Sequence, residues 1–210
     1  MLLLSDPRVS DVPAIECGED LVDVRDIPEL ALDLRKQDAT GAWARLRASV
    51  AERLLAAQSS LPADVRLLVI EGHRPAALQQ RYFEEHCADL ARTHPDWRPE
   101  HLVAEASKHI SPLAVAPHPC GAAVDLTLTA GDVELDMGTP VNATPEASAG
   151  ACFTAAENIT EEAALWRRVL SDALSGVGLV NYPPEWWHWS YGDRYWAAVT
   201  GAERATFTPR

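Results

Sequence analysis

The sequence predicts an α+β fold in which helices flank a small antiparallel sheet. Helical and strand patterns are mixed along the chain, without the regular succession of strand and helix that builds a parallel sheet. The chain has 210 residues, 47% of them hydrophobic, which is enough for one buried core and too apolar for intrinsic disorder. No repeat or linker divides it, so we expect residues 1–210 to form a single domain.

Helices are expected in four segments, from the spacing of apolar residues and from capping residues. They lie within residues 42–58, 75–91, 95–111 and 160–176. The second begins at a proline, which suits a first helical turn, and the fourth runs from a capping threonine, Thr160, to Gly176. The apolar stripe of the fourth helix is predicted to consist of Leu165, Trp166, Val169, Leu170, Ala173 and Leu174.

Strands are expected where apolar and β-branched residues cluster between turn residues. These segments are residues 65–70, 123–129, 133–135 and the start of the tryptophan-rich stretch 186–196. Residues 1–35 are expected to be irregular, because prolines interrupt their short apolar runs. Residues 137–158 lack periodicity and predict a long loop, which in compact domains often serves function.

The chain is acidic, with 18 Lys and Arg against 31 Asp and Glu and a formal net charge of −13. Such a surface repels phosphate backbones, so nucleic acid is not an expected partner. No apolar run approaches the roughly 18–20 residues of a membrane helix, and the first residues lack a secretion-signal pattern, which predicts a cytoplasmic protein without a membrane partner. The scattered cysteines are expected to be free thiols: Cys17, Cys87, Cys120 and Cys152.

Two of the seven histidines stand apart from the polar surroundings in which the others are expected to be solvated. His118 opens a segment that ends in Asp125, within a predicted strand. Val124 and Leu126 alternate onto one strand face, so Asp125 points to the other. A buried carboxylate there costs several kcal/mol unless a metal ion, an arginine or an accessible cleft compensates it. The alternative to a functional role is that Asp125 forms a structural ion pair.

The other distinctive histidine, His188, follows Glu185 in the tryptophan-rich segment. Imidazole and carboxylate are ligands of catalytic zinc, and a nearby carboxylate can act as a general base. The two prolines before Glu185 predict a turn at that residue and an extended chain from about Trp187; a turn places Glu185 and His188 on the same side. The alternative is a core strand that carries an incidental histidine and glutamate.

Arg74 follows the predicted strand 65–70, at an end where loops commonly carry functional groups. A guanidinium there can hold a developing oxyanion or a substrate carboxylate. The alternative is a structural arginine that ties the turn to Glu71.

Three segments together resemble a known family. They are Gly72-His73-Arg74-Pro75, His118-Pro119-Cys120-Gly121-Ala122-Ala123-Val124-Asp125 and Glu185-Trp186-Trp187-His188. From about residue 33 to 196, the order and spacing of these motifs resemble the zinc D-Ala-D-Ala dipeptidases of the vancomycin-resistance type, within the zinc D-Ala-D-Ala carboxypeptidase group. Residues 33–35 also resemble the family's early strand.

The resemblance implies a zinc ion (Zn2+) in a cleft on the sheet, with His118, Asp125 and His188 as its ligands. By the same resemblance, Glu185 is the catalytic base and Arg74 stabilises the transition state. The implied reaction is hydrolysis of D-Ala-D-Ala or a related small dipeptide. A zinc carboxypeptidase or amidase that acts on another small peptide or amide is the nearest alternative, and a zinc-binding module without catalysis is a third.

The expected substrate wall departs from the family pattern. Ala116 stands where the family has a serine, and Asn142 lies near the place of an aspartate that receives the substrate ammonium. Lys36 follows the early segment in place of a tyrosine. Loss of the aspartate's charge and the serine's hydroxyl predicts weaker binding of free D-Ala-D-Ala, unless Glu146 or Asp136 supplies the missing charge.

Overall fold

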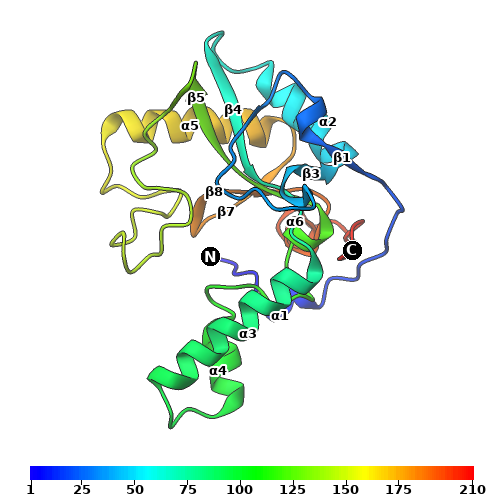
Figure 1. Ribbon diagram of the computed structural model, residues 1–210, viewed down its shortest axis with the longest axis vertical. Helices are drawn as coiled ribbons and strands as arrows, with labels where there is room; N and C mark the ends of the chain where they lie inside the picture. The colour runs from blue at the N-terminus through cyan, green and yellow to red at the C-terminus, as the bar shows by residue number, and fades with distance from the viewer.

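The computed structural model describes all 210 residues and is built around a six-stranded sheet (Figure 1). The strands run in the order β2-β4-β5-β8-β7, and β6 pairs with β5. They are β2 (Ala31–Leu32), β4 (Val65–Glu71), β5 (Ala123–Ala130), β6 (Val133–Glu134), β7 (Val180–Tyr182) and β8 (Glu185–Ser190). Every pairing is antiparallel except that of β2 with β4. The predicted antiparallel sheet is confirmed, with one parallel pair at its edge.

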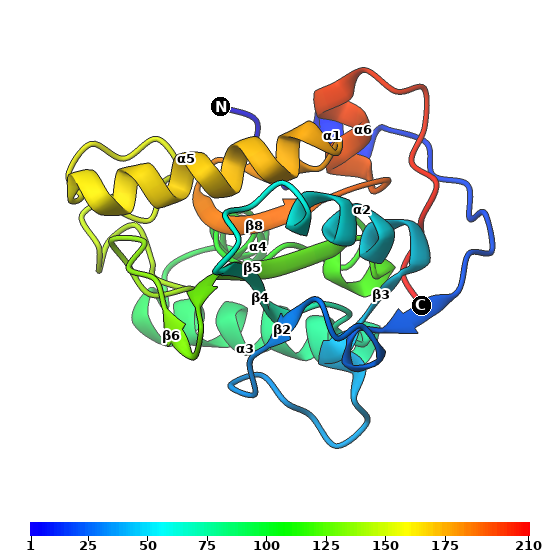
Figure 2. The same cartoon turned by 90° about the horizontal axis from the view of Figure 1, so that it is seen from above.

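Six α-helices surround the sheet. They are α1 (Pro7–Ser10), α2 (Ala48–Gln58), α3 (Ala76–Thr93), α4 (Pro99–Ala106), α5 (Glu161–Gly176) and α6 (Arg194–Thr200). Helices α2 and α5 pack together over one side of the sheet, and α3 and α4 form a hairpin that projects from the opposite side (Figures 1 and 2). No helix has the length and apolar character needed to cross a bilayer.

The main core lies between the sheet and the pair α2 and α5. On β5, Val124 and Leu126 are fully buried in this core, together with Leu54 of α2 and Leu170 of α5. Because side chains alternate along a strand, Asp125 is directed to the opposite face. The face that is not used for the core is therefore the one on which the candidate site is built.

The helix predicted at residues 42–58 is shorter than expected. Ala42–Ala44 form a 3-10 turn, and Arg45–Arg47 form β3, which pairs with β1 (Leu21–Asp23) in a separate two-stranded sheet. Arg47 is completely buried, and its guanidinium donates to both carboxylate oxygens of Glu16. These tertiary contacts override the helical spacing, so α2 begins only after β3.

The amino-terminal segment is less irregular than predicted. It contains α1, β1, a 3-10 turn at Val24–Asp26 and β2. The strands β1 and β2 are stabilised by pairing with β3 and β4, partners that are distant in sequence. The early strand also lies at Ala31–Leu32 rather than at residues 33–35, and the Asp33 N–H donates to the Val69 carbonyl at its end.

The remaining predicted helices are confirmed as α3, α4 and α5. The Thr160 side chain caps α5 by accepting a hydrogen bond from the Ala163 N–H at 3.1 Å. The buried side of α5 differs from the prediction, because Leu165 is 48% exposed and Arg167 is buried instead. The Arg167 guanidinium donates bonds of 2.7–2.8 Å to three carbonyls in the loop before α5, and this loop has no helix or strand, as predicted.

The carboxyl-terminal region contains the predicted strand, β8, and then a helix that was not predicted. Asp193 begins α6 by accepting hydrogen bonds from the N–H groups of Tyr195 and Trp196 at 2.7 and 3.1 Å. The cysteines are unpaired, as predicted, with two of them buried: Cys120 and Cys152.

Candidate metal centre and active site

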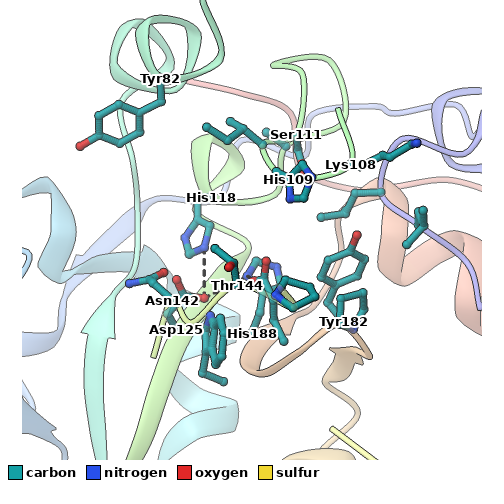
Figure 3. A pocket seen from close by; sticks show the side chains of 18 of the residues that line it. Tyr82, Lys108, His109, Ser111, His118, Asp125, Asn142, Thr144, Tyr182 and His188 are labelled. Carbon is teal, nitrogen blue, oxygen red and sulfur yellow. Dashed lines mark hydrogen bonds and ion pairs between the residues drawn. The ribbon is translucent and has the colours of Figure 1, made fainter. Parts of the chain in front are cut away.

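Three ligand-type side chains converge on the face of the sheet opposite the core. His118, Asp125 and His188 are buried, and their ligand atoms all lie within 4.8 Å of one another. His118 Nε2 and His188 Nδ1 lie 3.3 and 2.9 Å from the same atom, Asp125 Oδ1. Figure 3 shows this cluster at the base of a cavity, where both rings approach the carboxylate.

Local structure explains how the three come together. Asp125 on β5 and His188 on β8 are direct cross-strand partners, so the sheet register sets their separation. His118 lies in a 3-10 turn, His118–Cys120, which ends at Gly121 with φ 67°. This left-handed conformation favours glycine at the end of the turn.

The tautomer of His118 is set by the turn after β4. His118 Nδ1 lies 2.7 Å from the Gly72 carbonyl oxygen, which can only accept, so Nδ1 carries the proton and Nε2 presents a lone pair. Gly72 itself is tightly enclosed, since a Cβ there would lie 2.4 Å from the Arg45 carbonyl oxygen. A backbone carbonyl that holds the second nitrogen of a histidine is a common support for a metal ligand.

The donor set fits zinc. Burial opposes ionisation of Asp125, but the adjacent His118 and His188 hold the pKa of its carboxyl well below the ordinary value. The cluster therefore offers two imidazole nitrogens and one carboxylate oxygen, and three protein ligands of this kind are typical of catalytic rather than structural zinc.

Glu185 reaches the cluster through an irregularity between β7 and β8. Asn181 pairs with Trp189, but the next residue, Tyr182, pairs with Glu185, so three residues of β8 bulge out of the ladder. The Asn181 side-chain amide donates to the carbonyls of Glu185 and His188, at 3.0 Å each. A bulge re-aims side chains, and here it brings residues three apart in a strand to the same side.

This geometry corrects the prediction of a turn at Glu185. The turn lies at residues 183–184, and Glu185 is already the first residue of β8. Glu185 Oε2 nevertheless lies 3.9 Å from His188 Nδ1. Desolvation raises the pKa of Glu185 above its ordinary value, and the neighbouring charge of His188 opposes this rise.

Arg74 makes the ion pair of the structural alternative and also lies beside the metal cluster, while its role in the reaction stays a prediction. Its Nε and Nη2 donate to the two carboxylate oxygens of Glu71 at 2.7 and 2.8 Å, the ion pair of the structural alternative. Glu71 ends β4 and is the register partner of Asp125 on β5. The Arg74 side chain remains 14% exposed and lines the same cavity as the His/Asp cluster.

One cavity of about 820 Å³ contains every predicted site residue. These are Arg74, Ala116, His118, Asp125, Asn142, Glu146, Glu185 and His188. The sheet and its adjoining turns form the end of the cavity that holds the His118, Asp125 and His188 cluster. The α3–α4 hairpin forms one wall, and the loop before α5 forms another. Asn142 adopts φ 67°, a left-handed conformation that Asn tolerates better than most residues.

Sequence reasoning missed several residues that line this cavity. Tyr182 is the clearest, since its ring packs edge-on against His188 with ring centroids 5.9 Å apart and its hydroxyl points into the cavity (Figure 3). Tyr82 and Gln79 enter from α3. No motif marks these positions in the sequence. The one available signal is the pair of prolines after Tyr182, which indicates a turn next to that residue.

Comparison with known proteins identifies the family. The profile of the D-Ala-D-Ala dipeptidase family, peptidase family M15, matches residues 35–202. The chain belongs to this family. As a member it is a metallopeptidase with zinc as its cofactor, in agreement with the donor set of the cluster.

Individual relatives of this M15 peptidase are distant. A D-alanyl-D-alanine dipeptidase from Synechocystis sp. is 27% identical over 218 residues, covering 89% of this chain and 87% of the relative. The LD-carboxypeptidase LdcB shares the fold at 16% identity, with a TM-score of 0.51 over 90% of this chain and 74% of that one. The vancomycin-resistance D,D-pentapeptidase VanY, solved with Zn(II), aligns with a TM-score of 0.43 and 19% identity over 81% of this chain and 84% of its own.

Proposed function

We propose that this M15 peptidase hydrolyses D-Ala-D-Ala or a related small dipeptide in the 820 Å³ cavity. The observation that carries the proposal is the convergence of Glu185 and Arg74 on the same cavity as the His118, Asp125 and His188 cluster. The Synechocystis relative with this activity in its name matches nearly the whole chain.

His118, Asp125 and His188 would hold the zinc ion. When bound, zinc supplies a Lewis acid that polarises the carbonyl of the scissile peptide bond. His118 serves through Nε2, because its Nδ1 proton is committed to the Gly72 carbonyl. The cross-strand pair of Asp125 and His188 holds the other two donor atoms in place.

Glu185 would act as general base and then as general acid. Its carboxylate takes one proton from the water that attacks the scissile carbonyl carbon. As the C–N bond breaks, Glu185 returns that proton to the leaving nitrogen, so the products are a carboxylic acid and an amine. Arg74 would donate to the carbonyl oxygen as negative charge develops on it.

The walls of the cavity would determine the substrate. Asn142 and Glu146 lie in the loop that Arg167 holds, and Ala116 precedes the turn of His118. Asn142 offers an amide oxygen but no charge to the ammonium group of a free dipeptide. Glu146 supplies the carboxylate on this side of the cavity, and we propose it as the ammonium partner.

The test is an assay of free alanine released from D-Ala-D-Ala, N-acetyl-D-Ala-D-Ala and L-Ala-L-Ala, as D-alanine for the first two and as L-alanine for the third. The parent protein should cleave D-Ala-D-Ala, and Glu185→Gln should retain zinc while turnover falls by about 10²–10⁴-fold. Glu203→Gln, an exposed change outside the cavity, is the matched control. Cleavage of the N-acetylated substrate alone would favour the carboxypeptidase alternative, and no loss in Glu185→Gln would show that Glu185 is not the base.

The cytoplasmic location stays a prediction.

A further inference from the structure

Gln79 is a buried polar side chain that neither the metal cluster nor the proposed chemistry uses. It lies in the first turn of α3 and is only 2% exposed. Arg74 Nη1 donates to Gln79 Oε1 at 2.8 Å, and Gln79 Nε2 donates to the Ser111 carbonyl at 2.7 Å. Both ends of the amide are therefore engaged, one of them by the arginine proposed to stabilise the transition state.

The two partners leave only one orientation for this amide. A guanidinium can only donate and a backbone carbonyl can only accept, so the amide oxygen must face Arg74 and the amide nitrogen must face Ser111. A carboxylate at this position would lose the donor to Ser111, and an apolar side chain would lose both bonds. Glutamine is thus matched to its two neighbours.

Gln79 and Glu71 together hold the guanidinium of Arg74. Three of its five N–H groups are engaged. Glu71 accepts from Nε–H and from one hydrogen on Nη2, and Gln79 accepts from one hydrogen on Nη1. One hydrogen on each terminal nitrogen is left, and Arg74 lines the cavity. An arginine side chain has several rotatable bonds, so its terminal nitrogens stay in place only where other groups hold them.

We propose that Gln79 is a positioning residue for Arg74, which it orients so that the two remaining N–H groups are presented to the substrate oxygen. The proposal rests on the proposed function, because it assigns the purpose of Arg74 to that reaction. Gln79 also ties Arg74 to the segment from Ser111 to His118, so the arginine and the first metal ligand share one support.

A double-mutant cycle tests this role. Gln79→Met should lower kcat for D-Ala-D-Ala by about 10–100-fold, with KM changed less than about threefold, because a small displacement of a group that acts in the transition state is costly. In an Arg74→Ala background the same change should cost less than about twofold. An equal loss in both backgrounds, or no loss in the parent, would overturn the proposal.

Two further variants keep the cycle interpretable. Gln80→Met, at an exposed position on the same helix, controls for the new side chain. Gln79→Asn keeps the amide but is too short to bridge both partners, so it should reproduce the kcat loss if Gln79→Met fails to fold. Zinc content and the unfolding midpoint are measured for each variant.

A readout without substrate separates this proposal from the proposed function. In ¹⁵N NMR spectra, the terminal N–H groups of a held guanidinium give separate signals, and those of a free one average. Arg74, assigned with Arg74→Lys, should give separate signals in the parent and averaged ones in Gln79→Met. If the parent does not hydrolyse D-Ala-D-Ala, the substrate proposal fails while this test of Gln79 stands; unchanged Arg74 signals in Gln79→Met would refute the positioning role.

Discussion

His188 is the residue on which the metal site and the proposed base both depend. Its Nδ1 faces Asp125 at 2.9 Å and Glu185 at 3.9 Å. Its side chain is buried, with 4% exposed, and lines the cavity beside the other two proposed ligands. The metal affinity of the protein should therefore depend on this side chain together with His118 and Asp125.

We expect His188→Ala to lose zinc. Removing even a group that only supports a ligand costs about 10–100-fold in affinity, and removing a ligand should cost more. Zinc per chain after dialysis against a weak chelator is the measurement, with the exposed His101→Ala as matched control. A stoichiometric zinc content in His188→Ala would contradict the assigned ligand set.

Asn142 offers a second test at the level of one residue. Asn142→Asp should lower KM for D-Ala-D-Ala by about tenfold, because a charge-assisted bond to the substrate ammonium is worth roughly 1.4 kcal/mol more than a neutral one. The backbone conformation at φ 67° admits both residues. N-acetyl-D-Ala-D-Ala has no ammonium, so its KM should stay unchanged; an equal gain for both substrates would rule out this explanation.

At the scale of elements, the bulge in β8 decides whether base and ligand meet. Without it, residues three apart in a strand would point to opposite faces. The Asn181 side-chain amide donates hydrogen bonds to the carbonyls of Glu185 and His188, the residues at the two ends of the bulge. A single side chain on β7 thus maintains the shape of β8.

Asn181→Ala should destabilise the fold and reduce turnover together. The change removes the two hydrogen bonds that Asn181 donates and the one that it accepts from the Thr154 hydroxyl. At this half-buried position, their loss should lower the free energy of unfolding by about 1–3 kcal/mol. Urea denaturation measures this, with Asn158→Ala as control, since the Asn158 side chain makes a single bond to a carbonyl in an exposed loop. Wild-type stability and turnover in Asn181→Ala would mean that the bulge is held by other contacts.

For the whole molecule, one ion pair between the buried Arg47 and the partly exposed Glu16 joins the two chain ends to the site. Glu16 accepts from the fully buried Arg47 and from the Thr208 N–H at 2.9 Å. Arg47 Nε donates to the Cys120 carbonyl at 2.7 Å, in the turn that carries His118. Burial opposes ionisation of Glu16, but bonds from Arg47, Thr208 and Gly18 lower its pKa from 4.5 to about 2.

This shift predicts a pH-dependent contribution to stability. Because the pKa is lower in the folded than in the unfolded state, the contribution is complete above about pH 5 and is lost as the pH falls from 4.5 to about 2. Glu16→Gln should lower the free energy of unfolding by about 2–3 kcal/mol at pH 7, at roughly 1.4 kcal/mol per pKa unit with a discount for partial exposure. The difference from the parent should vanish near pH 2.

Urea denaturation of both proteins at pH 7, 4 and 2.5 measures this difference. The exposed change Glu157→Gln is the control. A constant difference across this range would show that Glu16 acts through packing and not through its charge.

Local sequence patterns were sufficient to predict most of the elements. The alternation around Asp125 predicted β5 and the face on which this carboxylate lies. The resemblance of three short motifs to a known family implied the ligand set and the base, and the structure brings these residues to one cavity. Residues such as Gln79 and Tyr182 could not be recognised, because a buried amide or phenol has no distinctive neighbours in sequence.

The sequence by itself determined the elements whose periodicity is local, the acidic charge and the chemical groups of the site. Only the tertiary structure decided β1, β2 and β3, the bulge that turns Glu185 toward His188, and the clamp on Arg74. The reason is physical: a helix or an amphipathic strand is encoded by residues a few positions apart, whereas a strand pairing, a bulge or a side-chain clamp exists only when distant segments supply its hydrogen bonds. The segment Arg45–Arg47 shows this most directly. Leu46 fits the helical spacing of apolar residues over 42–58, but pairing with β1 makes the segment a strand.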